Sequence, residues 1–132
     1  MALGATRDQA EIAEGRGMRA ARLRAIKADV VANLGRGDLS VTHVAKQHGV
    51  TPRYVQMLFE AEGTTFSGFV REQRLERARR LLTDPRCSDR TISVIAYSVG
   101  FGDLSHFNHA FRRRYGASPS EVRATVRRDN PG

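Results

Sequence analysis

One pattern occurs twice in this chain, about fifty residues apart, and it limits the folds that the chain can form. Each copy, Ser40–Gly63 and Thr91–Gly116, has a capped amphipathic segment, a glycine turn and a second helical segment that ends in Phe and Gly. Six positions correspond between the copies: Val41 with Ile92, Val44 with Ile95, Ala45 with Ala96, Gly49 with Gly100, Val55 with Phe107, and Phe59 with Phe111. A small Ala where two helices cross, a Gly at the turn and apolar residues that face one core are typical of a helix-turn-helix unit. Two such units on one short basic chain indicate duplex DNA as the partner.

Helix-start and helix-stop residues divide most of the chain into helical segments. Six residues are predicted N-caps: Ser40, Thr51, Thr65, Thr91, Asp103 and Ser118. The predicted helices span residues 18–34, 41–48, 53–62, 66–82, 92–99, 104–115 and 119–127. No segment alternates apolar and polar residues between hairpin turns, so the predicted fold class is all-α. Residues 1–17 carry mixed charges without a sustained period, which favours a flexible segment or an interdomain remnant.

The composition narrows the classes of partner. The formal net charge is +8, and most of the positive charge comes from Arg, whose guanidinium forms bidentate hydrogen bonds with phosphate and guanine. An anionic membrane is the competing partner for such a charge, but no apolar run approaches the roughly 18 residues of a spanning helix, and the N-terminus lacks a signal-peptide core. Cys87 is the only cysteine, so an internal disulfide and a cysteine-based zinc site are excluded. It is expected to be an exposed thiol in a polar loop, and the expected location of the chain is the cytoplasm, at the nucleoid.

The stretch GFGDLSHFNHAFRRRYGASPSEVR, Gly100–Arg123, resembles the AraC/XylS family of bacterial transcription regulators. The segments LFEAEGTTF (Leu58–Phe66) and EQRLERARRLL (Glu72–Leu82) extend the resemblance to about residues 26–123. The resemblance implies a seven-helix domain over about residues 18–128, in which a long central helix joins two helix-turn-helix units that enter successive major-groove segments. Family members usually also carry an effector-binding or dimerisation domain, for which 132 residues leave no room. The chain is therefore expected to be the DNA-binding part of a longer, effector-responsive regulator, with a small stand-alone activator as the alternative.

The second helix of a helix-turn-helix unit presents the outward side chains near its N-terminus to the base edges. Seven residues hold such positions: Arg53, Gln56 and Met57 in the first unit, and Leu104, Ser105, Asn108 and His109 in the second. Arg53 is suited to guanine O6 and N7, Gln56 to adenine N6 and N7, and Met57 to the thymine methyl group. The second unit has no Arg near its helix start, so the first unit is expected to discriminate bases more strongly. The resemblance supports these positions but does not carry over base preferences.

Several residues of the two units have a second interpretation. Four are candidates for phosphate contacts: Thr51, Thr91, Arg112 and Arg113. The two Thr could equally serve only as helix caps, Leu104 could cover the edge of the core, and Ser105 could supplement a cap. The arginines of the central helix lie one turn from Glu72 and Glu76, which favours a solvated, salt-bridged face over DNA contact.

Other function classes have weaker support. His106 and His109 stand three residues apart, but two imidazoles without nearby carboxylates or thiolates make a poor metal site, so no metal and no cofactor are expected. No phosphate loop, nucleophile elbow or paired-carboxylate cleft indicates an enzyme. A contact with RNA polymerase is compatible with DNA binding, and an effector ligand is expected only if a further N-terminal domain exists. The alternative from another class is a basic helical module that binds RNA or a protein.

Overall fold

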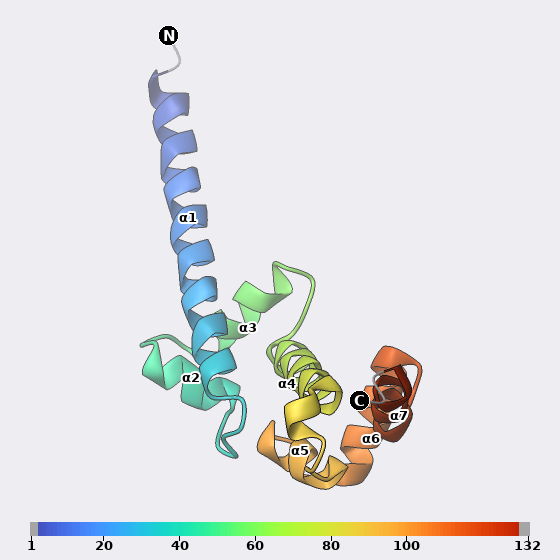
Figure 1. The fold of residues 1–132 in the computed structure, drawn as a ribbon. Helices are drawn as coiled ribbons and strands as arrows, with labels where there is room; N and C mark the ends of the chain where they lie inside the picture. The colour runs from blue at the N-terminus through green and yellow to red at the C-terminus, as the bar shows by residue number, and fades with distance from the viewer. Residues whose placement is uncertain (1–2, 130–132) are drawn as a thin grey trace. The chain divides into compact units, whose positions relative to one another are not determined.

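The computed structural model describes the backbone of residues 3–129 and the side chains of residues 9–128. Within that range the chain forms seven α-helices and no strand, which confirms the predicted all-α class. The elements are α1 (Leu3–Ala32), α2 (Val41–Gln47), α3 (Pro52–Glu60), α4 (Phe66–Thr83), the 3-10 turn η1 (Pro85–Cys87), α5 (Ile92–Ser98), α6 (Leu104–Tyr115) and α7 (Pro119–Asp129) (Figure 1). They divide into two compact units, the first made of residues 3–32 and 40–66 and the second of residues 33–39 and 67–129.

The helix α1 is longer than its sequence pattern predicts. The expected start at Met18 is wrong, because the helix begins at Leu3 and runs unbroken through Gly15 and Gly17. Residues 3–17 contain Ala, Glu, Gln and Arg, which favour helix without needing a buried face. The N-terminal half of α1 extends past α2 and α3, and its apolar Ile12 is 53% exposed (Figure 1). Residues 1 and 2 lie outside the described range, and a role of this segment as an interdomain remnant stays a prediction.

The first unit packs α1, α2 and α3 around one apolar core. Its buried residues are Leu23, Ile26, Val30, Val44, Ala45, Val55, Leu58, Phe59 and Phe66. Ser40 and Thr51 accept hydrogen bonds from the backbone N–H of His43 and Tyr54, as expected of N-caps. A hydrogen bond of 3.0 Å joins a carboxylate oxygen of Asp29, on α1, to Nε2 of His48, the residue that caps the end of α2. Short local signals and one shared core therefore fix the orientation of α3 within this unit.

The second unit packs α4 to α7 around an aromatic core. Its main cluster consists of Leu75, Ala78, Leu82, Ile95, Ala96, Val99, Phe101, Phe107 and Phe111. Ring centroids lie 5.0 Å apart between Phe101 and Phe107 and 5.6 Å apart between Phe107 and Phe111, within the range of favourable aromatic pairs. The helix α4 is continuous from Phe66 to Thr83, close to the predicted range of 66–82.

The connection between α4 and α5 is more ordered than a polar loop. Cys87 is buried, so the expectation of an exposed thiol is wrong. The guanidinium of Arg123, on α7, is itself buried and donates hydrogen bonds to the carbonyl oxygens of Arg90 and Cys87. Burial lowers the pKa of Arg123 from its ordinary value. The side chain of Arg123 thus attaches this connection to the last helix of the second unit.

The segment Asn33–Leu39 follows α1 but belongs to the second unit. Its Leu34 carbonyl accepts a hydrogen bond of 3.0 Å from Nε of Arg74, on α4. Gly100 has φ of +112° and lies against the same carbonyl, where an added Cβ would come closer than 3.0 Å. The backbone of the second turn is therefore packed against this segment with no space for a side chain.

Candidate nucleic-acid interface

The helix α3 has one fully buried face and one exposed face. Val55 and Phe59 are 0% exposed, and Thr51 with Pro52 begins the helix. Arg53, Gln56 and Met57, the three predicted base-contact residues of this unit, are all exposed on the opposite face. Met57 is 48% exposed although it is apolar. The buried residues prevent α3 from rotating about its own axis. These three side chains therefore point out of the unit near the helix N-terminus.

The helix α1 places arginines beside α3 that the sequence pattern did not reveal. Arg16 and Arg19 line a groove of about 520 Å³ together with Met57. The guanidinium of Arg22 lies over the ring of Tyr54, 5.9 Å from its centroid, which is within cation–π range. The one sequence signal for these arginines is spacing. Arg19 precedes Leu23 by four residues, so it lies on the same side of α1 as the buried residues, one turn before the core begins. The edge of the α3 surface is thus more positive than α3 alone.

The helix α6 repeats this arrangement in the second unit. Phe107 and Phe111 are 0% exposed, and the Asp103 side chain accepts a hydrogen bond of 2.9 Å from the backbone N–H of His106. Of the four predicted base-contact residues here, three are exposed: Ser105, Asn108 and His109. Leu104 is half-buried, so part of its side chain packs against the core edge and part stays exposed. The exposed N-terminal face of α6 therefore carries smaller and less charged side chains than that of α3.

The four predicted phosphate-contact residues divide into caps and cations. Thr51 and Thr91 accept hydrogen bonds from the backbone N–H of Tyr54 and Val94, so both serve as caps. A hydroxyl that accepts a hydrogen bond still has its own proton to donate, so the cap geometry of Thr51 is compatible with a phosphate contact. Arg112 and Arg113 are exposed on the last turns of α6.

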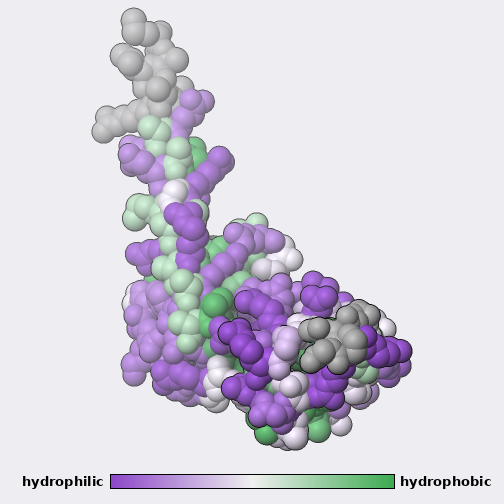
Figure 2. Space-filling model, in the orientation of Figure 1, coloured by the Kyte–Doolittle hydropathy of each residue, from purple (hydrophilic) through white to green (hydrophobic). Residues whose placement is uncertain are grey.

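The surface favours a polar partner. In the view of Figure 2 hydrophilic residues cover most of the surface, and apolar residues show mainly along α1. None of the helices in the described range is long and apolar enough to cross a membrane. Among the residues whose placement is described, no group of three or more His, Cys, Asp or Glu side chains is arranged to hold a metal ion.

Comparison with known proteins agrees with this geometry. A family model described as a helix-turn-helix domain matches residues 44–125. A transcriptional regulator from Chromobacterium violaceum, solved as a crystal structure and described as an AraC-type DNA-binding domain-containing protein, is 31% identical to the chain. The match covers 90% of this chain and 99% of that one, with a TM-score of 0.72. This chain belongs to the AraC/XylS family.

Relatives of this AraC-type chain are transcription regulators. The transcriptional activator RhrA of Rhizobium meliloti (strain 1021) is 47% identical over 102 residues, which are 77% of this chain and 32% of RhrA. The transcriptional activator NphR of a Rhodococcus species is 37% identical over 91 residues, which are 69% of this chain and 26% of NphR. The chain spans about a third or less of the length of these two relatives. The predicted family is confirmed, and the chain is a DNA-binding transcription regulator domain.

Proposed function

We propose that this AraC-type domain reads two successive major-groove segments of duplex DNA, one with α3 and one with α6. The observation that carries the proposal is the shared design of the two helices. Each begins at a side-chain cap, and each buries an equivalent pair of residues completely: Val55 with Phe59 and Phe107 with Phe111. The buried pairs fix the opposite, exposed faces for contact with base edges.

The first unit supplies most of the base discrimination in this proposal. Arg53 would donate two hydrogen bonds to guanine O6 and N7, and Gln56 would pair with adenine N6 and N7. Met57 would contact a thymine methyl group. In the second unit the proposed base contacts are Asn108 and His109, with smaller contributions from two residues at the helix start: Leu104 and Ser105.

The sugar-phosphate backbone would be held by residues around the two helices. The proposed phosphate contacts are Thr51, Thr91, Arg112 and Arg113. Contacts of this kind set the register of the protein on the duplex but carry no sequence information of their own. The net charge of +8 supports strong, salt-dependent binding.

Selection of bound duplexes from a random pool tests this proposal, followed by variants on the recovered site. Gln56→Ala and Arg53→Ala should each weaken the specific complex by about 1–3 kcal/mol and relax the preference at one or two adjacent base pairs. Gln47→Ala is the matched control, since Gln47 is an exposed glutamine of α2 and should leave base preferences unchanged.

Two results would contradict these assignments. If the chain recovers no consensus and excess random DNA removes it from every duplex, it is a basic module for RNA or a protein instead. If Gln56→Ala lowers the affinity equally for specific and random DNA, Gln56 contacts phosphate and not a base.

On the likeness to RhrA and NphR, both named as transcriptional activators, we propose that the regulator containing this domain activates transcription in the cytoplasm, where bacterial DNA lies. Activation would require contact with RNA polymerase, and an effector would bind outside the region described here. Transcription from a template that carries the selected site, with and without the chain, tests this step, and an unchanged or lower yield of transcript contradicts it.

A further inference from the structure

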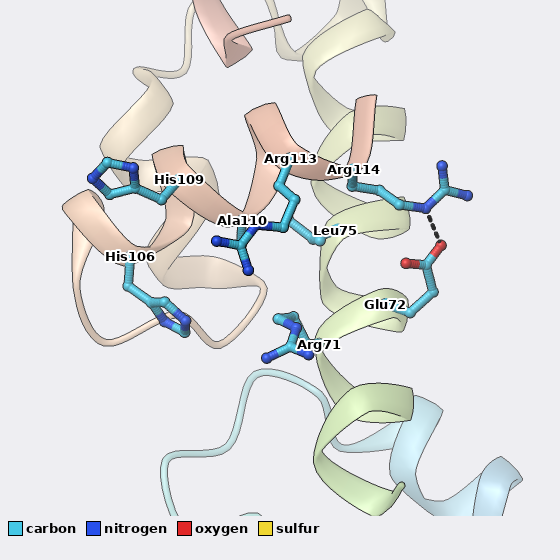
Figure 3. A pocket seen from close by; sticks show the side chains of 8 residues that line it. All are labelled: Arg71, Glu72, Leu75, His106, His109, Ala110, Arg113 and Arg114. Atoms are coloured by element: carbon cyan, nitrogen blue, oxygen red, sulfur yellow. Dashed lines mark hydrogen bonds and ion pairs between the residues drawn. The ribbon is translucent and has the colours of Figure 1, made fainter. Parts of the chain in front are cut away.

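A basic pocket in the second unit lies between α4 and α6. Its volume is about 330 Å³, and besides Arg114 four of its lining side chains are cationic or titratable bases: Arg71, His106, His109 and Arg113. Figure 3 shows that Arg71 comes from α4, whereas the other three come from α6, and that Arg71, His106 and Arg113 extend toward the same space. Leu75 and Ala110 add apolar surface to the lining. Two guanidinium groups and two imidazoles thus lie around one pocket beside a short apolar wall.

The one carboxylate that lines this pocket is already paired. Glu72 accepts a hydrogen bond of 2.7 Å from Nε of Arg114, which turns away from the convergence of the other bases (Figure 3). This hydrogen bond raises the pKa of Arg114 from its ordinary value. Among the described residues, neither Arg71 nor Arg113 has an ion-pair partner. Glu72, the acidic residue next to Arg71 in the sequence, therefore does not pair with it.

Two guanidinium groups that line one pocket, neither of them paired with its carboxylate, repel each other, and an anion between them offsets this repulsion. The oxygens of a phosphate accept bidentate hydrogen bonds from the fork of Arg, and imidazole N–H groups can donate to the same oxygens. The ring of His106 lies beside that of Phe101, with 5.8 Å between ring centroids. The donor set is therefore suited to a phosphate.

We propose that Arg71, His106 and Arg113 form a site that binds one backbone phosphate of the duplex beside α6. This inference rests on the proposed docking of α6 in the major groove. His109 belongs both to the pocket and to the outward row of α6, so the pocket borders the proposed base-reading face. Arg71 is thereby a positioning residue on α4 that fixes the register of α6 on DNA without reading a base.

The test compares Arg71→Gln with Arg80→Gln in the full chain, on a duplex recovered by selection. Arg80 is nine residues further along α4, hence on the opposite face, and lies 4.0 Å from Glu76. Both variants lose one charge, but only Arg71→Gln should flatten the plot of log Kobs against log[salt], by about 0.9. The affinity ratio between the unaltered chain and Arg71→Gln should then shrink about 3.5-fold between 50 and 200 mM salt.

Neutral methylphosphonates at single positions of the second groove segment locate the phosphate. One of them should weaken binding of the unaltered chain more than binding of Arg71→Gln, which keeps only the contacts of His106 and Arg113 with that phosphate. Equal salt slopes for Arg71→Gln and Arg80→Gln, with no such position, overturn the phosphate site. If Gln56→Ala still loses its base preference in that case, the proposed function survives; if Gln56→Ala and Asn108→Ala both bind like the unaltered chain, the proposed function itself has failed.

A free phosphate is the other source of the same chemistry. Inorganic phosphate added to the DNA-free chain should give no saturable shift of the His106 and His109 ring signals in NMR spectra. Saturable binding that Arg71→Gln abolishes, with no change in the salt slope on DNA, would assign the pocket to a small phosphorylated ligand and overturn the backbone assignment.

Discussion

The two glycines at equivalent turns, Gly49 and Gly100, should respond differently to the same substitution. Both have positive φ, +66° and +112°, a conformation that costs an alanine roughly 1–2 kcal/mol. A Cβ at Gly49 would meet no atom within 4 Å. At Gly100 it would collide with the Leu34 carbonyl and lie 2.5 Å from Nε of Arg74.

The collision at Gly100 falls on a hydrogen bond. Nε of Arg74 donates to Leu34 O at 3.0 Å, and burial lowers the pKa of this guanidinium from its ordinary value. Breaking a hydrogen bond to a charged group costs about 1.5–3 kcal/mol. Gly100→Ala should therefore lower the free energy of unfolding by about 2.5–5 kcal/mol. Gly49→Ala should lower it by about 1 kcal/mol, because a smaller entropy of the unfolded chain offsets part of the strain.

Urea unfolding of the full chain, followed by far-UV circular dichroism and by amide resonances from each unit, measures both losses. In a thermal melt of the same variants, a loss of 1 kcal/mol lowers the melting temperature of a unit of this size by about 4–8 °C. The difference between the variants is therefore readily resolved. Equal losses for the two variants would refute the argument, since they would show that the contact with Leu34 and Arg74 adds nothing to the strain of the turn.

Two further predictions concern buried side chains. Phe59→Ala and Phe111→Ala should each cost about 3–5 kcal/mol of unfolding free energy, because both rings are 0% exposed; an unchanged urea midpoint for either would show that the helix faces are misassigned. Arg123→Lys should cost about 1–3 kcal/mol, since a compact ammonium lacks the planar fork with which the guanidinium spans the carbonyls of Arg90 and Cys87. The same variant should also expose the buried thiol, so a thiol reagent should modify Cys87 faster than in the unaltered chain; equal rates would mean that Arg123 does not hold the connection in place.

Signals within one or two turns of the sequence were sufficient to predict most helices and their cores. Side-chain caps act over three residues, and apolar spacing of three or four residues marks the face that a helix buries. The caps at Thr51 and Asp103 were predicted in this way, as were the buried rings of Phe59 and Phe107. The repeat made the prediction more specific, since one unit supported the interpretation of the other. The same spacing predicted the exposed residues near the start of α3 and those of α6 except Leu104, which is half-buried.

The sequence alone thus determined the helical class, the two helix-turn-helix units and the family, whereas tertiary packing decided which distant polar groups meet. Arg74 bonds a carbonyl 40 residues away, and Arg114 bonds Glu72 from 42 residues away. Arg123 reaches the carbonyl of Cys87 across 36 residues. A long side chain has many possible partners in an unfolded chain, and no local periodicity records its choice, because that choice depends on which surfaces the folded cores bring together. For this reason the pairing of Glu72, and with it the unpaired charge of Arg71, could be seen only in the folded unit.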